Sequence, residues 1–190
     1  TFTNQVVTFL YLAYRLAGRD TAELAVIPDL MEKTLEMVTP QVAAIAPQVN
    51  VWNDLYCLGY GATYAMALEG ALKLKEITYA HCEGMLSTEF KHGPLSAVTE
   101  GYPILFAAGP QDVQLIVSGI NEVTCRGARA IAIGEEDARL RANASDMIVL
   151  PKSTPEIASL LAVLPLQLLS YHMSVMRGFD PDFPRNLSKT

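Results

Sequence analysis

Two carboxylates and an amine fall on one face of a helix expected within the segment from Ala67 to Pro94. With Glu69 set to zero on a helix of about 3.6 residues per turn, Lys73 lies at roughly 40° and Glu76 at roughly −20°. Lys75 points elsewhere. Proton-transfer chemistry needs such groups held close together. The same spacing also fits a solvated face with an ordinary Glu-to-Lys pair, and spacing alone leaves both interpretations open.

A histidine follows in the same segment, where His92 stands directly before the Gly93-Pro94 turn. An imidazole suits proton shuttling because its charge changes near neutral pH. A lone histidine beside a turn can equally be a hydrogen-bonded structural residue. The residues by themselves therefore mark His92 as a candidate and no more.

Composition and charge limit the classes of partner. The chain has 190 residues, of which 51% are hydrophobic and 18% charged, which fits one globular domain with a real core. The 14 basic and 20 acidic residues give a net charge of −6, which argues against nucleic acid or an anionic membrane as the main partner. Cys57, Cys82 and Cys125 are odd in number and have no metal-ligand spacing. We therefore predict a reduced cytoplasmic setting, with no metal and no disulfide scaffold.

Two observations concern targeting and completeness. The longest apolar candidate, Ile157 to Leu169, is interrupted by Ser159, Pro165 and Gln167, so we do not expect it to span a membrane. The N-terminus lacks an initiating Met and a basic region ahead of its apolar stretch. This fits neither a signal peptide nor a whole gene product, and we expect the sequence to be part of a longer chain.

The pattern of apolar residues predicts an α/β fold. Three-to-four spacing predicts amphipathic helices over Thr3–Ala17 and Leu30–Ala46, which we expect to cover a sheet. Short apolar runs that end at Gly or Pro, with helical patterns between the first three, predict buried parallel strands. These runs are Asp54–Leu58, Pro103–Ala108, Ala130–Ile133 and Asp146–Leu150. We expect a fifth strand at Ser159–Leu164, and then a last helix over Pro165–Arg177.

Two loops of such a sheet could meet a ligand, because ligands bind outside the carboxyl ends of parallel strands. Gly59–Thr63 contains a Gly-x-Gly, but it lacks the third glycine and the acidic residue of a dinucleotide site. Ala107–Asp112 contains no serine or threonine, so it is poor in the hydroxyls that bind phosphate. The glycines of the first loop let the backbone approach a ligand, and the helix behind it could hold an anion, whereas we expect the second loop to be a poor phosphate site.

Three motifs resemble a known family: ALEGALKLKE at residues 67–76, KHGPL at 91–95 and DFPRNLSK at 182–189. They are similar to the sugar isomerase (SIS) domain, in the form found as the second of two such domains in the glucosamine-6-phosphate synthase family. The similarity runs over almost the whole chain, while Cys82–Phe90 departs from it. It implies a three-layer α/β/α SIS fold with a five-stranded parallel sheet. Residues 1–177 would be the SIS domain and residues 178–190 an active-site tail.

The resemblance also implies roles for single residues. Glu76 matches the base that moves a proton between C1 and C2 of the open-chain sugar, and Lys73 matches the lysine one turn before it. We expect the helix to hold Glu76 near the carboxyl end of a strand. His92 matches the histidine that opens the sugar ring, in the active site of a neighbouring subunit. Lys189 matches the lysine that forms an imine with the ketose carbonyl, for which the amine must be unprotonated.

The implied activity is ketose–aldose isomerisation of fructose 6-phosphate towards glucosamine 6-phosphate, without a cofactor. The implied partners are these sugar phosphates, a second copy of the chain, and upstream a first SIS domain and possibly a glutaminase domain. The family's serine-rich phosphate loop lies in that first domain, so we expect an incomplete active site here. Two alternatives stay open: a glucosamine-6-phosphate deaminase or deglycase of the double-SIS type, and a non-catalytic sugar-phosphate-binding module.

Overall fold

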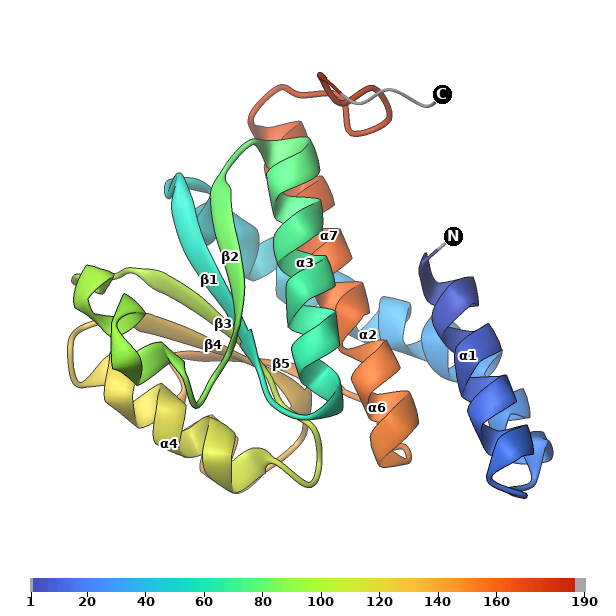
Figure 1. Cartoon of the computed structure of the whole chain (residues 1–190). Helices are drawn as coiled ribbons and strands as arrows, with labels where there is room; N and C mark the ends of the chain where they lie inside the picture. The colour runs from blue at the N-terminus through green and yellow to red at the C-terminus, as the bar shows by residue number, and fades with distance from the viewer. Residues whose placement is uncertain (1, 187–190) are drawn as a thin grey trace.

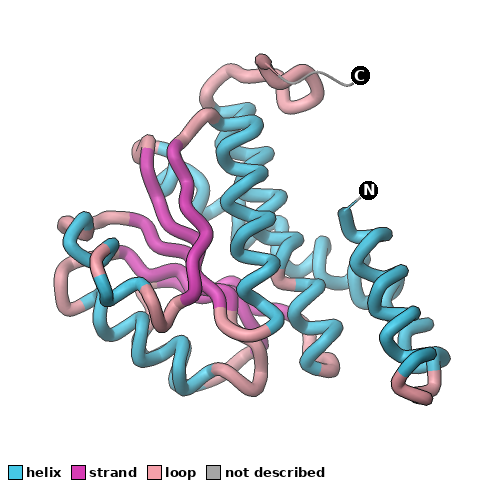
Figure 2. The backbone as a smooth tube through the Cα atoms, in the orientation of Figure 1, coloured by secondary structure: helices cyan, strands magenta, loops and turns pink. Residues whose placement is uncertain are grey.

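Five parallel strands form one sheet in the computed structural model, which describes residues 2–186 (Figures 1 and 2). The order across the sheet is β2-β1-β3-β4-β5. The strands are β1 (Asp54–Gly59), β2 (His81–Leu86), β3 (Pro103–Ala107), β4 (Arg129–Glu135) and β5 (Asp146–Leu150). The helices are α1 (Phe2–Leu16), α2 (Ile27–Asn50), α3 (Ala62–Thr78), α4 (Val113–Thr124), α5 (Ala138–Asn143), α6 (Pro155–Leu161) and α7 (Val163–Met176), with short 3-10 turns η1 (Thr21–Val26), η2 (Phe90–His92) and η3 (Pro94–Ala97).

The sheet lies between two layers of helices, so the predicted three-layer α/β/α fold is confirmed. Alternate residues of β3 face opposite cores, because side chains alternate along a strand. Leu105 belongs to the core beneath α2, α3, α6 and α7, whereas Ile104 and Phe106 belong to the core beneath α4 and α5. Figure 1 shows α3 and α7 side by side on one face and α4 on the other.

The predicted position of the fifth strand was wrong. Residues 159–164 form the end of α6, a one-residue turn and the start of α7, and the missing strand is β2, His81–Leu86, at the edge of the sheet. A short apolar run that is buried on all sides looks alike as strand or helix. The sequence HCEGML carries a charge and a glycine, because an edge strand exposes part of its surface.

The two predicted N-terminal helices form, but only the second covers the sheet. Helix α2 packs on α7 and β5, whereas α1 packs mainly on η1 and lies beyond α2 (Figure 1). Helix α2 also continues past the predicted end at Ala46 to Asn50, although Pro40 and Pro47 lie inside it. Both prolines are on the exposed face, where water can satisfy the carbonyls that lose their helical partner.

The stretch Pro155–Met176 is long and apolar enough to span a membrane by length and composition alone. In this fold 78% of its most apolar window is buried, and α7 packs against α2 and α3. It is therefore a core element of the domain.

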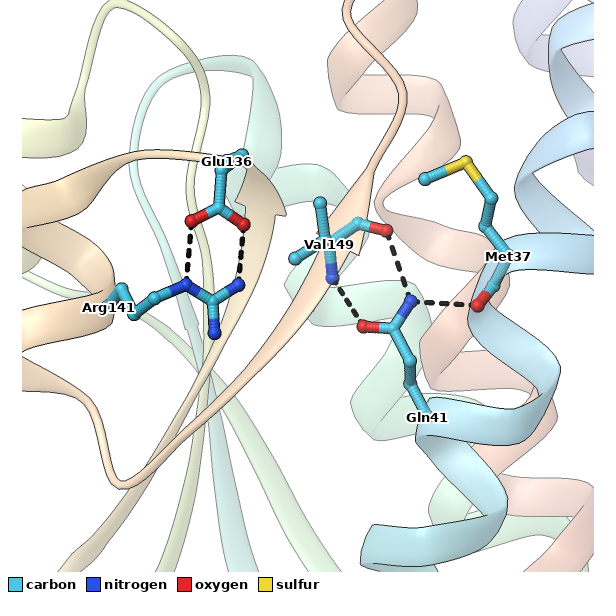
Figure 3. Close-up of polar contacts among 5 residues, drawn as sticks. All are labelled: Met37, Gln41, Glu136, Arg141 and Val149. Carbon is cyan, nitrogen blue, oxygen red and sulfur yellow. Dashed lines mark hydrogen bonds and ion pairs between the residues drawn. The ribbon is translucent and has the colours of Figure 1, made fainter.

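The opposite edge strand, β5, is covered by a side chain from α2 (Figure 3). The Val149 N–H donates to Oε1 of Gln41 at 2.9 Å, and Nε2 of Gln41 donates to the Met37 carbonyl at 2.8 Å. The Gln41 amide thus stands in for a neighbouring strand and shields this edge from pairing with another chain. Figure 3 also shows the two-pronged Arg141–Glu136 pair, which is half exposed and contributes little to stability.

Candidate active site

The face predicted from spacing exists on α3. Lys73 Nζ donates to Glu76 Oε2 at 2.5 Å and lies 3.6 Å from Glu69 Oε1. The side chains of Glu69, Lys73 and Glu76 are 11%, 31% and 25% exposed, so this is a partly buried cluster and not a solvated face.

Burial and charge act in opposite directions on these groups. Burial raises the pKa of Glu69, and the repulsion by Glu76 adds to this while Lys73 opposes it. Burial alone would lower the pKa of Lys73, but the hydrogen bond to Glu76 and the charges of both carboxylates outweigh it, so the pKa is raised. Lys73 therefore stays protonated between the two carboxylates and orients Glu76.

The cluster lies at the opposite end of the sheet from the one we expected. Helix α3 leaves the carboxyl end of β1 and runs back to the start of β2, so Glu76, in its last turn, lies at the amino edge of these parallel strands. The expectation of a position near a carboxyl end was therefore wrong. The reason is that a crossover helix runs antiparallel to its strands, and Glu76 stands at the helix end and not at its start.

Close packing fixes α3 against its neighbours. A Cβ on Gly70 would lie 2.4 Å from Cδ1 of Leu166 in α7, and one on Gly84 in β2 would lie 2.8 Å from the Cα of Leu68. The absence of side chains at these two glycines lets α7 and β2 approach the helix closely. A side chain on this helix is thereby held by a rigid element.

The C-terminal tail passes over the ends of α3 and α7, next to the cluster (Figure 1). Gly178 (φ +74°) ends α7, and the Phe179 N–H donates to the Ser174 carbonyl at 3.0 Å, as in a glycine helix cap. One hollow of 480 Å³ lies beside Glu76 and is lined by tail residues Arg185 and Asn186. A second, of 380 Å³, adjoins Glu76 and Lys73 on the side of tail residues 181–184.

Arg177 joins three helix ends beneath this tail. Its guanidinium donates to Asn50 Oδ1 at 2.8 Å and to the carbonyls of Asn50, Thr78 and Trp52 at 3.0, 3.0 and 2.6 Å. Burial without an acidic partner lowers its pKa. The arginine satisfies carbonyls at the C-terminal ends of α2 and α3 and ties them to the end of α7.

The other predicted residues are distributed differently. His92 is exposed on η2, beyond the carboxyl end of β2, and no hydrogen bond or ion pair within residues 2–186 joins it to the Glu76 cluster. Lys189 lies outside the described residues. Lys75, although off the Glu69 face, lines the 480 Å³ hollow beside Glu76.

The loops that follow the carboxyl ends of β1 and β3 form a poor binding site for an anion. The carboxylate of Asp112 lies where side chains on Gly61 and Gly109 would be, with distances of 3.3 and 2.9 Å from their virtual Cβ atoms. Burial raises the pKa of Asp112. The Thr63 hydroxyl, which could have met a ligand, donates to the Ala107 carbonyl at 2.8 Å. A carboxylate at this crevice opposes phosphate, which agrees with the absence of serine and threonine from the second loop.

Three residues that the sequence patterns did not single out shape the site: Tyr79, Arg177 and Arg185. Arg185 lies within the DFPRNLSK motif, so the motif was a signal for it. Tyr79 and Arg177 carry no comparable signal, because their partners are distant in sequence. Within residues 2–186 no three His, Cys, Asp or Glu side chains form a metal-type cluster, and Cys57, Cys82 and Cys125 are free thiols.

Comparison with known proteins adds a family. Residues 49–177 match the model of the SIS domain. The chain is 39% identical over 198 residues to glutamine–fructose-6-phosphate aminotransferase (isomerizing) of Pyrobaculum aerophilum, covering all of this chain and 33% of that protein. It is 43% identical over 171 residues to the protein of the same name from Clostridium tetani, covering 88% of this chain and 28% of the relative. The chain thus spans about a third of the length of the curated relatives it matches.

Solved structures agree. The C-terminal domain of glucosamine-fructose-6-phosphate aminotransferase from Francisella tularensis has a TM-score of 0.78 at 34% identity, over 84% of this chain and 46% of that one. Glucosamine-6-phosphate deaminase from Thermotoga maritima has a TM-score of 0.81 at 22% identity, over all of this chain and 55% of that one. The second similarity shows a shared fold.

Proposed function

The chain belongs to the SIS domain family, and we propose that it carries the isomerase half of a glutamine–fructose-6-phosphate aminotransferase. Its reaction would be ketose–aldose isomerisation of fructose 6-phosphate on the way to glucosamine 6-phosphate. The observation that carries this proposal is the partly buried Glu69–Lys73–Glu76 cluster beneath the C-terminal tail. Residues 1–177 would form the SIS domain and 178–190 its active-site tail, in a cytoplasmic enzyme.

Glu76 is the general base in this proposal. It moves the proton between C1 and C2 of the open-chain sugar, and the protonated Lys73 holds its carboxylate in one orientation through the 2.5 Å hydrogen bond. Glu69 holds Lys73 from the other side. A charged lysine between two carboxylates keeps the base in place without a cofactor.

Lys189 is the imine-forming amine. It stands three residues beyond Asn186, which lines the hollow beside Glu76, and three residues of chain span at most about 10 Å. That reach is short enough for the amine and the base to meet one substrate. The 11 residues from Gly178 to Ser188 would thus serve as its support.

His92 serves a second copy of the chain. Its exposed position beyond β2, away from Glu76, supports a role in the site of a neighbouring subunit, where it would open the sugar ring. We propose a homodimer on this ground. Sedimentation at tens of micromolar that detects only a monomer would contradict it.

The phosphate of the sugar would bind outside this chain, in a first SIS domain upstream, with a glutaminase domain as a possible further neighbour. Asp112 at the carboxyl-end crevice supports this assignment, because a carboxylate repels phosphate. Titration of residues 1–190 with fructose 6-phosphate in a calorimeter should therefore show only weak binding. Micromolar affinity would mean that a phosphate site lies within this chain.

The test of the base is Glu76→Gln in the full-length protein. The amide keeps the shape and one acceptor but cannot take the proton, so exchange of the C1 or C2 hydrogen with solvent should fall by about 10² to 10⁴. Glu36→Gln, an exposed carboxylate on α2, is the matched control and should leave exchange unchanged. Exchange at the wild-type rate in Glu76→Gln would refute the assignment.

A further inference from the structure

Tyr79 has an unusual backbone for its residue type. It follows α3 directly and has φ 59° and ψ 13°, the left-handed region that favours glycine. A tyrosine there is disfavoured by its Cβ. Contacts of the side chain must therefore compensate, and those contacts identify its role.

The Tyr79 side chain holds the C-terminal tail at two points. Its ring packs edge-to-face on Phe179 with 4.7 Å between centroids, and the Arg185 guanidinium lies over the same ring at 3.9 Å. The Arg185 N–H donates to the Tyr79 hydroxyl at 3.0 Å. One residue of α3 thus fixes both ends of the loop from Phe179 to Arg185.

The contacts of Tyr79 with Phe179 and Arg185, here called the latch, lie beside the proposed base, Glu76. Glu76 lies one helical turn before Tyr79, and both line the 480 Å³ hollow together with Arg185 and Asn186. The chain therefore leaves the latch, at Asn186, already beside Glu76. Arg177 fixes the floor beneath it by bonding to the Thr78 carbonyl at 3.0 Å.

We propose that Tyr79 is a positioning residue: by holding Phe179 and Arg185 it fixes the tail, up to Asn186, at the hollow beside Glu76 where the sugar phosphate would bind. The inference rests on the proposed function, since it concerns delivery of Lys189 to the ketose. In that step the unprotonated Lys189 amine nitrogen forms a C=N double bond to the C2 carbonyl carbon, and the carbonyl oxygen leaves as water together with the two amine hydrogens. A fixed tail raises the rate because the amine no longer has to search for the carbonyl.

The first experiment measures the latch itself by hydrogen–deuterium exchange of the tail in the 190-residue chain. Tyr79→Phe keeps the ring but removes the acceptor, so the Arg185 amide should exchange about 2- to 10-fold faster. Tyr79→Gly suits the left-handed backbone and removes both contacts, so peptides covering residues 179–186 should all exchange faster. Tyr171→Phe, on the exposed side of α7, is the control. Unchanged tail exchange in Tyr79→Gly would overturn the inference.

The second experiment traps the imine in the full-length protein. Cyanoborohydride reduces the C=N bond formed from fructose 6-phosphate, with hydride from the reagent and a proton from water, and mass spectrometry locates the adduct. In Tyr79→Gly the rate of labelling at Lys189 should fall at least about tenfold, and in Tyr79→Phe less, while urea unfolding of Tyr79→Gly stays near wild type. Because Tyr79→Phe keeps the aromatic ring, its smaller loss of labelling rate, together with the unchanged unfolding of Tyr79→Gly, distinguishes positioning from a loss of folding.

The outcomes separate the two proposals. Wild-type labelling at Lys189 with the same rate in Tyr79→Gly would overturn the role of Tyr79 and leave the proposed function standing. No adduct at Lys189 in the wild type would overturn both the imine assignment and the inference built on it.

Discussion

The substitution Gly70→Ala tests whether the close packing of α3 on α7 holds the site together. Its Cβ would lie 2.4, 2.8 and 2.9 Å from Cδ1, Cβ and Cγ of Leu166, which is 1% exposed. Rotation about the side-chain bonds of Leu166 can move its Cδ1 away, but its Cβ is fixed to the backbone. Helices α3 and α7 must therefore separate. Such overpacking costs typically about 1 to 3 kcal/mol, and Ala gains about 1 kcal/mol over Gly in helix propensity.

Because the immobile Cβ of Leu166 is among the clashing atoms, we take the upper end of the overpacking range, about 3 kcal/mol, and subtract the gain of about 1 kcal/mol in helix propensity. The free energy of unfolding should fall by about 2 kcal/mol, which for a chain of this size lowers the melting temperature by roughly 4 to 8 °C. Urea unfolding followed by circular dichroism measures it. Gly119→Ala in α4 is the matched control, since it gains the same propensity and its nearest contact is the end of a side chain, Cε1 of Phe106 at 3.2 Å.

The pair Gly70→Ala and Leu166→Ala isolates the contact. Leu166→Ala alone should cost about 2 to 5 kcal/mol through the cavity it leaves, and less when the new methyl at residue 70 occupies part of that space. Gly70→Ala as stable as the wild type, or additive effects in the double variant, would refute the packing argument.

Three further perturbations follow from the described contacts. The raised pKa of Glu69 means that ionising this carboxyl group costs more in the folded than in the unfolded chain. The unfolding free energy of the wild type, measured relative to that of Glu69→Gln, should therefore fall as pH rises from about 4.5 through the raised folded pKa. If urea titrations show this difference rising over the same pH window, the burial argument is contradicted. Arg177→Met removes four hydrogen bonds to helix ends and should cost about 2 to 3 kcal/mol, whereas Arg126→Met, at an exposed site, should change the melting temperature little; equal effects would count against the clamp. Thr63→Val leaves the buried Ala107 carbonyl without its hydroxyl donor and should cost about 1 to 3 kcal/mol by chemical denaturation, so a neutral result would mean that another donor replaces it.

The sequence by itself established the alternation of helices and strands and the composition of one helix face. Strands β1, β3, β4 and β5 were predicted because each is a buried apolar run that ends at a turn residue, which is a local signal. Likewise, the Glu69–Lys73–Glu76 cluster was predictable because residues three and four apart in a helix are neighbours whatever the rest of the fold does. The family resemblance extended these local patterns to roles.

Only the tertiary structure decided where the cluster lies and what covers it. The edge strand β2 carries too little hydrophobic signal to be found locally, and residues 159–164 are apolar because helices and sheet surround them. The position of Glu76 at the amino edge follows from the direction of the α3 crossover. Tyr79 and Arg185 are 106 residues apart in sequence, so their contact depends on the packing of α3, α7 and the tail together, which no spacing along the chain encodes.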